Sequence, residues 1–152
     1  AGRALKVLAA VEAANEAQKH VLGDKIKARF GKDLKGKRLA IWGLSFKPNT
    51  DDTREAASLT VIEDLRAAGA EVRAYDPVAK PEKLALAKSA MDAVQDCDAL
   101  VIVTEWAEFR SPDFAALKKA LRTPAIFDGR NLYDPATMKS HGFEYFANGR
   151  KA

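Results

Sequence analysis

Three short segments of this sequence carry side chains suited to binding a phosphorylated ligand. They are residues 44–54, 104–110 and 128–133. The ring of Phe46 offers a flat apolar surface to a base or a ribose. Lys47 supplies a mobile point charge, and the planar guanidinium of Arg130 matches the spacing of phosphate oxygens. A nucleoside diphosphate needs this combination of an apolar platform and concentrated positive charge.

Each segment directly follows an apolar run that predicts a β-strand. The runs cover residues 38–43, 99–104 and 125–128. Because the carboxyl ends of parallel strands lie along one edge of a sheet, we expect the three segments to converge where α/β proteins bind ligands. The competing interpretation is that residues 44–54 form only a solvated connection, since Asp, Asn and Thr are ordinary turn residues.

Two other classes of site fit the segment after the first strand less well. The adjacent acids Asp51 and Asp52 are typical of receiver domains, but that class also needs a phosphorylatable aspartate after the third strand, where none stands out. Both acids can also simply cap the helix that follows. An ordinary dinucleotide fingerprint is excluded, because Gly43 is the only glycine present of a Gly-x-Gly-x-x-Gly pattern.

Strand-like and helix-like patterns alternate over residues 36–152, which predicts one α/β domain. Further strands are expected over residues 71–75 and 144–146, and helices over 56–68, 81–88, 91–95, 113–121 and 135–141. Continuous apolar strands joined by helices predict right-handed crossovers and a mainly parallel sheet covered on both faces. The expected fold is a Rossmann-like three-layer α/β fold, preceded by a helix and linker in residues 1–35.

A long helix over residues 4–30 is predicted ahead of the α/β domain. Its apolar residues recur every three or four positions from Leu5 to Phe30, so they share one side. Asn15 and Gln18 interrupt that stripe, and a buried amide fixes register and partner in helix–helix seams. The alternative is that the helix packs only on its own domain, with the amides at its edge.

Composition sets limits on the partners of the chain. Its 152 residues are 47% hydrophobic and 30% charged, which suits one globular domain. No apolar run approaches the ~20 residues that cross a bilayer, and no basic-then-apolar leader is seen, so we expect a cytoplasmic protein with no membrane partner. Residues 1–38 hold ten Lys and Arg against four Asp and Glu. Their interleaving, without a reader motif, favours a solvated helix face over a nucleic-acid partner.

Other reactive or aromatic side chains receive no catalytic or metal-binding role. Cys97 is the only cysteine, which excludes an internal disulfide or a multi-cysteine metal site, and we expect a partly buried, unreactive thiol. His20 and His141 are isolated in the sequence. Trp106 is expected to anchor the core or an interface rather than to stack on a ligand. Glu105 is left unassigned.

Four ordered motifs resemble those of a single protein family. Residues 43–55 (GLSFKPNTDDTRE) are similar to the signature that opens the last domain of the UDP-glucose/GDP-mannose 6-dehydrogenase family, its UDP-sugar-binding domain. The further matching motifs are residues 74–77 (AYDP), 104–109 (TEWAEF) and 128–131 (DGRN). The resemblance spans nearly the whole chain. Residues 47–52 and 54–56 are more similar to the UDP-glucose enzymes than to the GDP-mannose enzymes.

The resemblance implies roles for particular residues. Phe46, Lys47 and Arg130 correspond to family residues that contact the UDP part of the substrate. Arg54 corresponds to an arginine that faces the pyrophosphate of the cofactor NAD across a domain cleft. In the family a long helix packs against its twin, so the resemblance also implies a homodimer formed through residues 4–30.

The resemblance further implies an activity for the full-length enzyme. The family member it suggests oxidises UDP-glucose to UDP-glucuronate with two NAD, but the family's cysteine motif and first dinucleotide-binding domain are not found in these 152 residues. We therefore expect a carboxy-terminal portion that binds a UDP-sugar, holds no catalytic residue and does not catalyse alone. The alternatives are a stand-alone nucleotide-sugar-binding or dimerisation module, or the same domain of a related UDP-sugar or GDP-mannose dehydrogenase.

Overall fold

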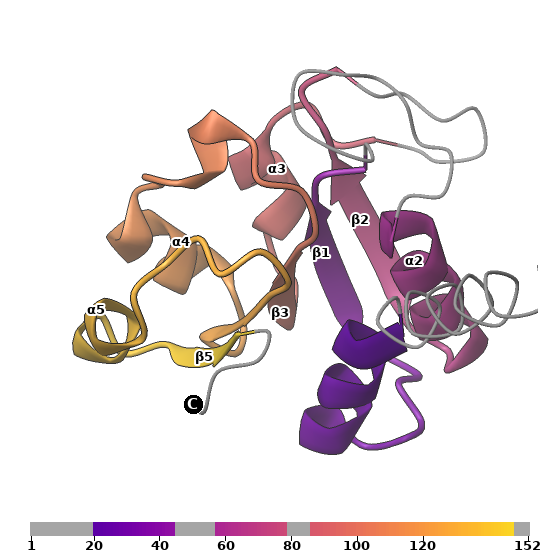
Figure 1. The fold of residues 1–152 in the computed structure, drawn as a ribbon. Helices are drawn as coiled ribbons and strands as arrows, with labels where there is room; N and C mark the ends of the chain where they lie inside the picture. Colours follow the sequence, from indigo (N-terminus) through magenta and orange to yellow (C-terminus); the bar gives the residue numbers. More distant parts are fainter. Residues whose placement is uncertain (1–19, 45–56, 79–85, 148–152) are drawn as a thin grey trace, which may run out of the picture.

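The chain folds around a five-stranded parallel β-sheet (Figure 1). The computed structural model describes residues 20–44, 57–78 and 86–147. The strands are β1 (Arg38–Trp42), β2 (Glu71–Tyr75), β3 (Ala99–Ile102), β4 (Ala125–Asp128) and β5 (Glu144–Ala147). They lie side by side in the order β2-β1-β3-β4-β5, and every neighbouring pair is parallel. The predicted parallel sheet is confirmed.

Helices cover both faces of this sheet. They are a helix over residues 20–30, α2 (Ala57–Ala67), α3 (Ala90–Val94), α4 (Phe114–Ala120) and α5 (Pro135–Ser140), together with a short 3-10 helix, η1 (Ala107–Phe109). Ser89, Asp113 and Asp134 cap three of the helices, each accepting a backbone N–H three residues further on. Within the described part of the chain, no helix is both long enough and apolar enough to cross a membrane.

Alternate residues of the inner strands fill two separate cores, one on each face of the sheet. In β1, Leu39 and Ile41 pack with α2 and with the helix over residues 20–30, whereas Ala40 and Trp42 pack with α3 and α4. None of these four side chains is more than 1% exposed. Since fully burying one large apolar side chain contributes about 1.5–3 kcal/mol, β1 stabilises both cores. The expected three-layer arrangement is confirmed.

The order of the strands reverses between β1 and β3. The chain moves outward from β1 to β2, then returns past β1 to β3, and continues to β4 and β5. In open parallel sheets, the carboxyl ends of the strands on either side of such a switch point border a crevice in which ligands bind. Two of the three segments predicted to bind a ligand therefore start at this switch point.

The helix over residues 20–30 packs on its own domain. Leu22 and Ile26 are buried in the core that this helix shares with α2. Gly23 allows a close approach to α2, because a Cβ there would lie 3.2 Å from Oδ2 of Asp64. The described part of the long helix thus contacts the α/β domain, and the choice between the two predicted packing modes is not tested. Residues 4–19, which carry most of the predicted dimer seam, lie outside the described residues.

Polar contacts join this helix to β5. The Nε and Nη2 groups of Arg29 donate to the two carboxylate oxygens of Glu144 at 2.8 and 2.9 Å. Lys25 Nζ donates to the carbonyl oxygen of Ala147 at 2.7 Å. The hydrogen bond from Arg29 lowers the pKa of Glu144 below its usual 4.5, and the charge of Arg29 acts in the same direction. The first described helix and the last described strand are therefore directly connected.

One predicted helix differs from the structure where it is described. The helix expected over residues 81–88 does not include Leu86, which forms an isolated parallel bridge with Ala74 of β2. The N–H of Ala87 donates to the carbonyl oxygen of Ala74 at 2.9 Å. Backbone pairing along the edge of β2 thus replaces a helical turn at residues 86–88.

Candidate functional site

The carboxyl ends of β1 and β3 touch at the switch point. Gly43 follows β1 with a φ of 98°, a conformation that favours glycine. A Cβ on this residue would lie 2.5 Å from Cβ of Thr104 and 2.7 Å from its backbone nitrogen, so a larger residue cannot be accommodated without movement. The N–H of Val103 donates to the carbonyl oxygen of Trp42 at 3.0 Å. These contacts hold the starts of two predicted binding segments together.

Arg130 lies at the same edge of the sheet, in the turn that follows β4. Its backbone N–H donates to Oδ1 of Asp128 at 2.9 Å, and its side-chain Nε donates to the carbonyl oxygen of Val103 at 3.0 Å. The second bond carries the guanidinium from the end of β4 to the end of β3, next to the switch point. Because Arg130 is exposed, its positive charge is presented at the edge where α/β proteins bind ligands.

A buried carboxylate organises the turn that carries Arg130. Asp128 is 0% exposed. In addition to the Arg130 N–H, it accepts at Oδ2 the N–H of Leu132 at 2.7 Å and the hydroxyl of Tyr145 at 2.6 Å. Tyr145 belongs to β5, the neighbouring edge strand. Since a buried charge is costly unless hydrogen-bonded, these three donors are what allow the carboxylate to remain inside.

A second buried tyrosine lies beside this turn, and its hydroxyl does not bond to the Asp128 carboxylate. Tyr133 is 5% exposed, and its hydroxyl donates to the carbonyl oxygen of Phe109, the last residue of η1. Burial raises the pKa of Tyr133 above its usual 10, and the nearby charge of Asp128 adds to the shift. The hydroxyl therefore stays protonated and continues to act as a donor at physiological pH.

Two positions in the turn are under unusual constraint. Asn131 adopts a left-handed conformation with a φ of 55°, and its side-chain oxygen is buried without a hydrogen-bond partner among the described residues. An unsatisfied buried acceptor costs about 1–3 kcal/mol. At Gly129, a Cβ would lie 2.8 Å from Cδ1 of Leu22 and 3.1 Å from the carbonyl oxygen of Ile102. Local costs of this kind concentrate at functional sites.

A second buried carboxylate joins the segments that leave β1 and β3. Asp76 directly follows β2 and is 3% exposed. Its Oδ2 accepts the N–H of Leu44 at 2.7 Å and the indole N–H of Trp106 at 3.1 Å, while Oδ1 accepts the N–H of Val78 at 2.9 Å. The carbonyl oxygen of Leu44 in turn accepts the hydroxyl of Ser58 at 2.8 Å. The residues on both sides of the predicted binding loop are thereby tied to one another.

The structure places one of the four predicted site residues. Arg130 lies at the predicted edge, beside the ends of β3 and β1. Phe46, Lys47 and Arg54 lie outside the described residues. The predicted ligand-binding roles of all four residues stay predictions. In the segment after β3, Trp106 is only 8% exposed and donates its indole N–H to a buried carboxylate. It anchors the core, as predicted.

Three residues that shape the site received no role from the sequence. Asp76 and Asp128 each stand at the carboxyl end of an apolar strand, within the AYDP and DGRN motifs. An acid directly after a strand could have been recognised from the sequence as a turn-shaping residue, because its carboxylate can accept the N–H groups of the turn that follows. Tyr145 gave no such signal, since an aromatic residue in a strand is typical of packing.

The described residues offer no metal site. No group of three His, Cys, Asp or Glu side chains that could hold a metal ion occurs among them. Cys97 is fully buried near the amino end of β3, and its thiol donates to the carbonyl oxygen of Ala93 at 3.1 Å. Burial raises the pKa of Cys97 to about 11. The thiol therefore stays protonated at neutral pH, which agrees with the prediction of an unreactive cysteine.

The turn after β1 does not fit the pyrophosphate of a dinucleotide. In the Rossmann fingerprint, glycines leave room for the pyrophosphate to approach the backbone closely. Here the space beside Gly43 is filled by Thr104, whose Cβ, backbone nitrogen and Oγ1 all lie within 2.7 Å of the position a Cβ would take. Among the described residues, this turn therefore provides no binding site for the pyrophosphate of NAD.

Comparison with known proteins gives a consistent result for this domain. Residues 40–135 match the model of the UDP-glucose/GDP-mannose dehydrogenase family, UDP binding domain. The UDP-glucose 6-dehydrogenase of Pseudomonas aeruginosa is 46% identical over 157 residues, which cover 95% of this chain and 35% of that protein. The chain spans about a third of the length of the curated relatives it matches.

Two solved structures of sugar-nucleotide dehydrogenases are similar to this domain in fold. The NDP-N-acetyl-D-galactosaminuronic acid dehydrogenase from Methanosarcina mazei Go1 superimposes with a TM-score of 0.74 at 27% identity, covering 89% of this chain and 29% of that one. A UDP-glucose dehydrogenase from Pyrobaculum islandicum gives a TM-score of 0.71 at 26% identity, with coverages of 92% and 31%. The chain therefore belongs to the UDP-glucose/GDP-mannose dehydrogenase family, and its α/β sheet corresponds to the UDP binding domain of that family.

Proposed function

We propose that this chain is the UDP-sugar-binding portion of a UDP-glucose 6-dehydrogenase. The observation that carries the proposal is the position of Arg130, an exposed arginine held by Val103 at the carboxyl edge of a sheet of the family's UDP binding domain. A guanidinium there can hold phosphate oxygens through paired N–H groups. The 46% identity to a UDP-glucose 6-dehydrogenase favours that substrate.

In this proposal, three residues bind the UDP moiety. Arg130 and Lys47 contact the diphosphate, and Phe46 provides the apolar platform for the base or ribose. The tie between Leu44 and Ser58 supports the assignment, because it joins the chain immediately before and shortly after Phe46 and Lys47. The ligand-binding segment would then start at the switch point, next to Arg130.

The complete activity requires more protein than this chain contains. For the full-length enzyme we propose oxidation of UDP-glucose with two NAD and water to UDP-glucuronate and two NADH, as a step in polysaccharide biosynthesis. NAD would bind mainly to the part of the relatives that lies outside this chain, with Arg54 facing its pyrophosphate. Mixed with UDP-glucose and NAD, the 152-residue chain should produce no NADH absorbance above buffer. Steady turnover would contradict the assignment of domains.

We also propose that the two parts of the chain have different functions. Residues 1–35 would form a dimerisation helix and linker, and residues 36–152 the cytoplasmic UDP-sugar-binding domain. Sedimentation of the full chain should show a homodimer. Removing residues 1–19 should yield monomers that still fold, because Leu22 and Ile26 remain to fill their core. A full chain that stays monomeric at high concentration would contradict the proposed dimer.

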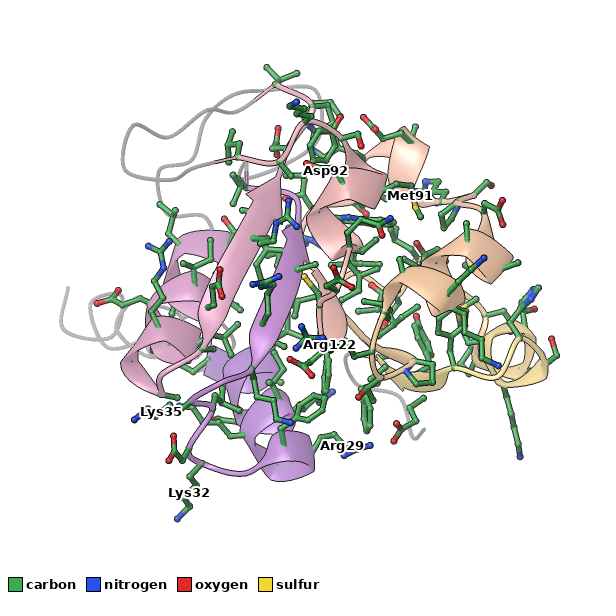
Figure 2. The ribbon with its side chains drawn as sticks, turned by 180° about the vertical axis from the view of Figure 1, so that it is seen from behind. Arg29, Lys32, Lys35, Met91, Asp92 and Arg122 are labelled. Carbon is green, nitrogen blue, oxygen red and sulfur yellow. The ribbon has the colours of Figure 1, made fainter. Side chains whose placement is uncertain are left out.

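Titration with UDP, GDP and UDP-glucose, followed by calorimetry or NMR, tests the ligand. UDP ligands should bind in preference to GDP, and Arg130→Ala should weaken UDP binding roughly tenfold to a hundredfold, or ~1.5–3 kcal/mol. Arg130→Lys should recover only part of the loss, since lysine keeps the charge but loses the paired N–H geometry. Arg122→Ala is the matched control, because Arg122 is another exposed arginine, next to Cys97 at the opposite end of the sheet (Figure 2).

Two results of this titration would contradict the proposed site. One is equal UDP affinity for the wild type and Arg130→Ala. The other is a set of ligand-induced shifts confined to surfaces remote from Phe46, Lys47 and Arg130. Either result would show that UDP does not bind at this edge of the sheet, without calling the fold into question.

A second candidate is a related dehydrogenase that acts on an amino-sugar nucleotide. The solved neighbour from Methanosarcina mazei, whose TM-score exceeds that of the Pyrobaculum islandicum enzyme, is named for an N-acetylated sugar acid. Turnover of a UDP-linked N-acetylhexosamine and of UDP-glucose by the full-length enzyme, where the rest of the sugar site is present, separates the candidates. Faster turnover of that substrate than of UDP-glucose would favour the second candidate.

A further inference from the structure

We propose that Tyr145 is a positioning residue for Arg130: its buried hydroxyl holds the Asp128 carboxylate, and that carboxylate fixes the turn that presents the guanidinium. The inference rests on the proposed function in taking the diphosphate of UDP as the ligand of Arg130. Its structural part, the dependence of Arg130 on Tyr145, concerns described residues alone.

The contacts form a short chain from β5 to the surface. The hydroxyl of Tyr145 lies 2.6 Å from Oδ2 of Asp128. Asp128 accepts the backbone N–H of Arg130 at 2.9 Å and that of Leu132 at 2.7 Å. These two amides flank the left-handed residue Asn131. The carboxylate thus sets the course of the backbone on both sides of the bend, including the point from which the Arg130 side chain departs.

The side chain of Arg130 then needs a defined starting point to reach its second anchor. Its Nε donates to the carbonyl oxygen of Val103, which follows the neighbouring strand, at 3.0 Å. A bond of this length tolerates only a small displacement of the turn before it weakens. Rotation of the turn would therefore change the direction of the guanidinium as well as its position.

Removal of the Tyr145 hydroxyl leaves the carboxylate one donor short in a buried place. Tyr145 is 6% exposed and Asp128 0%, so water does not readily replace the missing donor. A buried carboxylate that loses a hydrogen bond gains by moving toward solvent or by drawing in other donors. Both responses move the turn. Tyr145 would in this way influence the affinity for UDP without contacting the ligand, because it positions the arginine that binds the diphosphate.

The test compares Tyr145→Phe with a matched variant, Tyr133→Phe, in the full chain. Both substitutions remove one buried hydroxyl from the same core. The Tyr145 hydroxyl also accepts the backbone N–H of Tyr133 at 3.4 Å, so Tyr145→Phe should cause the larger loss of stability, and UDP affinities are compared at a temperature where both variants are folded. The hydroxyl of Tyr133 donates to Phe109 and not to Asp128. Tyr145→Phe should weaken UDP binding about threefold to tenfold, and Tyr133→Phe should leave it close to wild type.

A double-mutant cycle with Arg130→Ala isolates the path of the effect. If Tyr145 acts through Arg130, Tyr145→Phe should cause no further loss of UDP affinity in the Arg130→Ala background. Independently of any ligand, the NMR resonance of the Arg130 Nε–H, which reports its bond to Val103, should shift in Tyr145→Phe and stay in place in Tyr133→Phe.

The outcomes separate this inference from the proposed function. If wild type and Arg130→Ala bind UDP equally, the proposed function fails, and the Nε–H resonance still decides whether Tyr145 positions Arg130. The inference itself is overturned by an unmoved Nε–H resonance in Tyr145→Phe. Equal weakening of UDP binding by both tyrosine variants would overturn it as well, as would full additivity with Arg130→Ala.

Discussion

The two ends of the β-sheet use polar residues in opposite ways. At the carboxyl end, Asp76, Thr104 and Asp128 are at most 3% exposed, and the two carboxylates each accept three hydrogen bonds from described residues. At the amino end, Arg38 and Glu71 form an ion pair at 3.3 Å with the Glu71 side chain 64% exposed. Figure 2 labels further charged side chains near this amino end: Arg29, Lys32, Lys35 and Arg122.

The difference follows from what each end has to do. Exposed ion pairs contribute little to stability and specify little geometry, because water competes for both partners. Buried carboxylates are costly unless every oxygen is satisfied, so they hold their donors in fixed positions. At the amino end, Asp98 is the one buried acid in the described chain, and it accepts the backbone N–H of Arg38 at 2.8 Å. The carboxyl end is organised for precision, which is where a binding site requires it.

The largest effect is expected from the carboxylate that joins three segments. Asp76→Ala would leave the buried N–H groups of Leu44, Val78 and Trp106 without their acceptor. We expect the free energy of unfolding to fall by about 3–5 kcal/mol, measured by urea denaturation. Glu71→Ala, which removes an acid at the other end of β2, should cost less than about 1 kcal/mol. Similar losses of unfolding free energy for Asp76→Ala and Glu71→Ala would contradict the proposed difference between the two ends of the sheet.

The close contact at the switch point should give the next largest effect. Gly43→Ala introduces a Cβ at a φ of 98° and at 2.5 Å from Thr104. Gly31 has a φ of 101°, but nothing lies within 4 Å of the position that a Cβ would take, so Gly31→Ala carries the conformational cost alone. We expect about 1 kcal/mol for Gly31→Ala and an additional ~1–3 kcal/mol for Gly43→Ala. Equal losses in thermal unfolding would show that the crowding at Thr104 is relieved by a small shift.

A moderate effect is expected from the buried thiol at the amino end. Cys97→Ala removes a sulfur that is 0% exposed and packed against α3 and β3. The loss of buried volume should lower the free energy of unfolding by about 1–2 kcal/mol. UDP binding should remain unchanged, because this core position lies at the end of β3 opposite to Arg130. A variant that loses UDP affinity while remaining folded would mean that the two ends are coupled.

The smallest effect is expected from the ion pair between the first described helix and β5. Arg29→Ala should cost no more than about 1 kcal/mol, since the Arg29 and Glu144 side chains are 37% and 41% exposed. The pKa of Glu144 is lowered in the folded state, so its contribution is present above its usual pKa of 4.5 and is lost as the pH falls through the lower folded value. Denaturation midpoints of wild type and Arg29→Ala should therefore differ at pH 7 and converge in acid. If the midpoints of wild type and Arg29→Ala still differed by the same amount at about pH 2, the ion pair would not be the cause of the difference.

The regular elements were predictable because their signals are local. Apolar runs predicted β1 to β5, and the four helices that can be compared with α2 to α5 begin and end within one residue of the predicted bounds. Gly69 ends α2 with a positive φ of 101°, which is the conformation expected for glycine after a helix. The short 3-10 helix η1 was missed, since three residues carry too little periodicity to be recognised.

The hydrogen bonds that shape the site were not predictable, because they join residues distant in the sequence. Asp76 and Trp106 are 30 residues apart, and Asp128 and Tyr145 are 17 apart in different strands. A strand pattern reports which residues turn inward, not which polar atoms meet there. The position of Arg130 at the edge was predictable from sheet topology, whereas its anchor on Val103 was not.

The contacts between the helix over residues 20–30 and β5 can form only after nearly the whole domain has been synthesised. They join residues that are 115 and 122 positions apart. At about 5–20 residues per second, a ribosome needs roughly 6–25 s to make the intervening chain. During that interval the side of the helix that carries Leu22 and Ile26 lacks the final strand of its sheet. A nascent chain stalled before β5 should therefore be a better chaperone substrate than the finished domain.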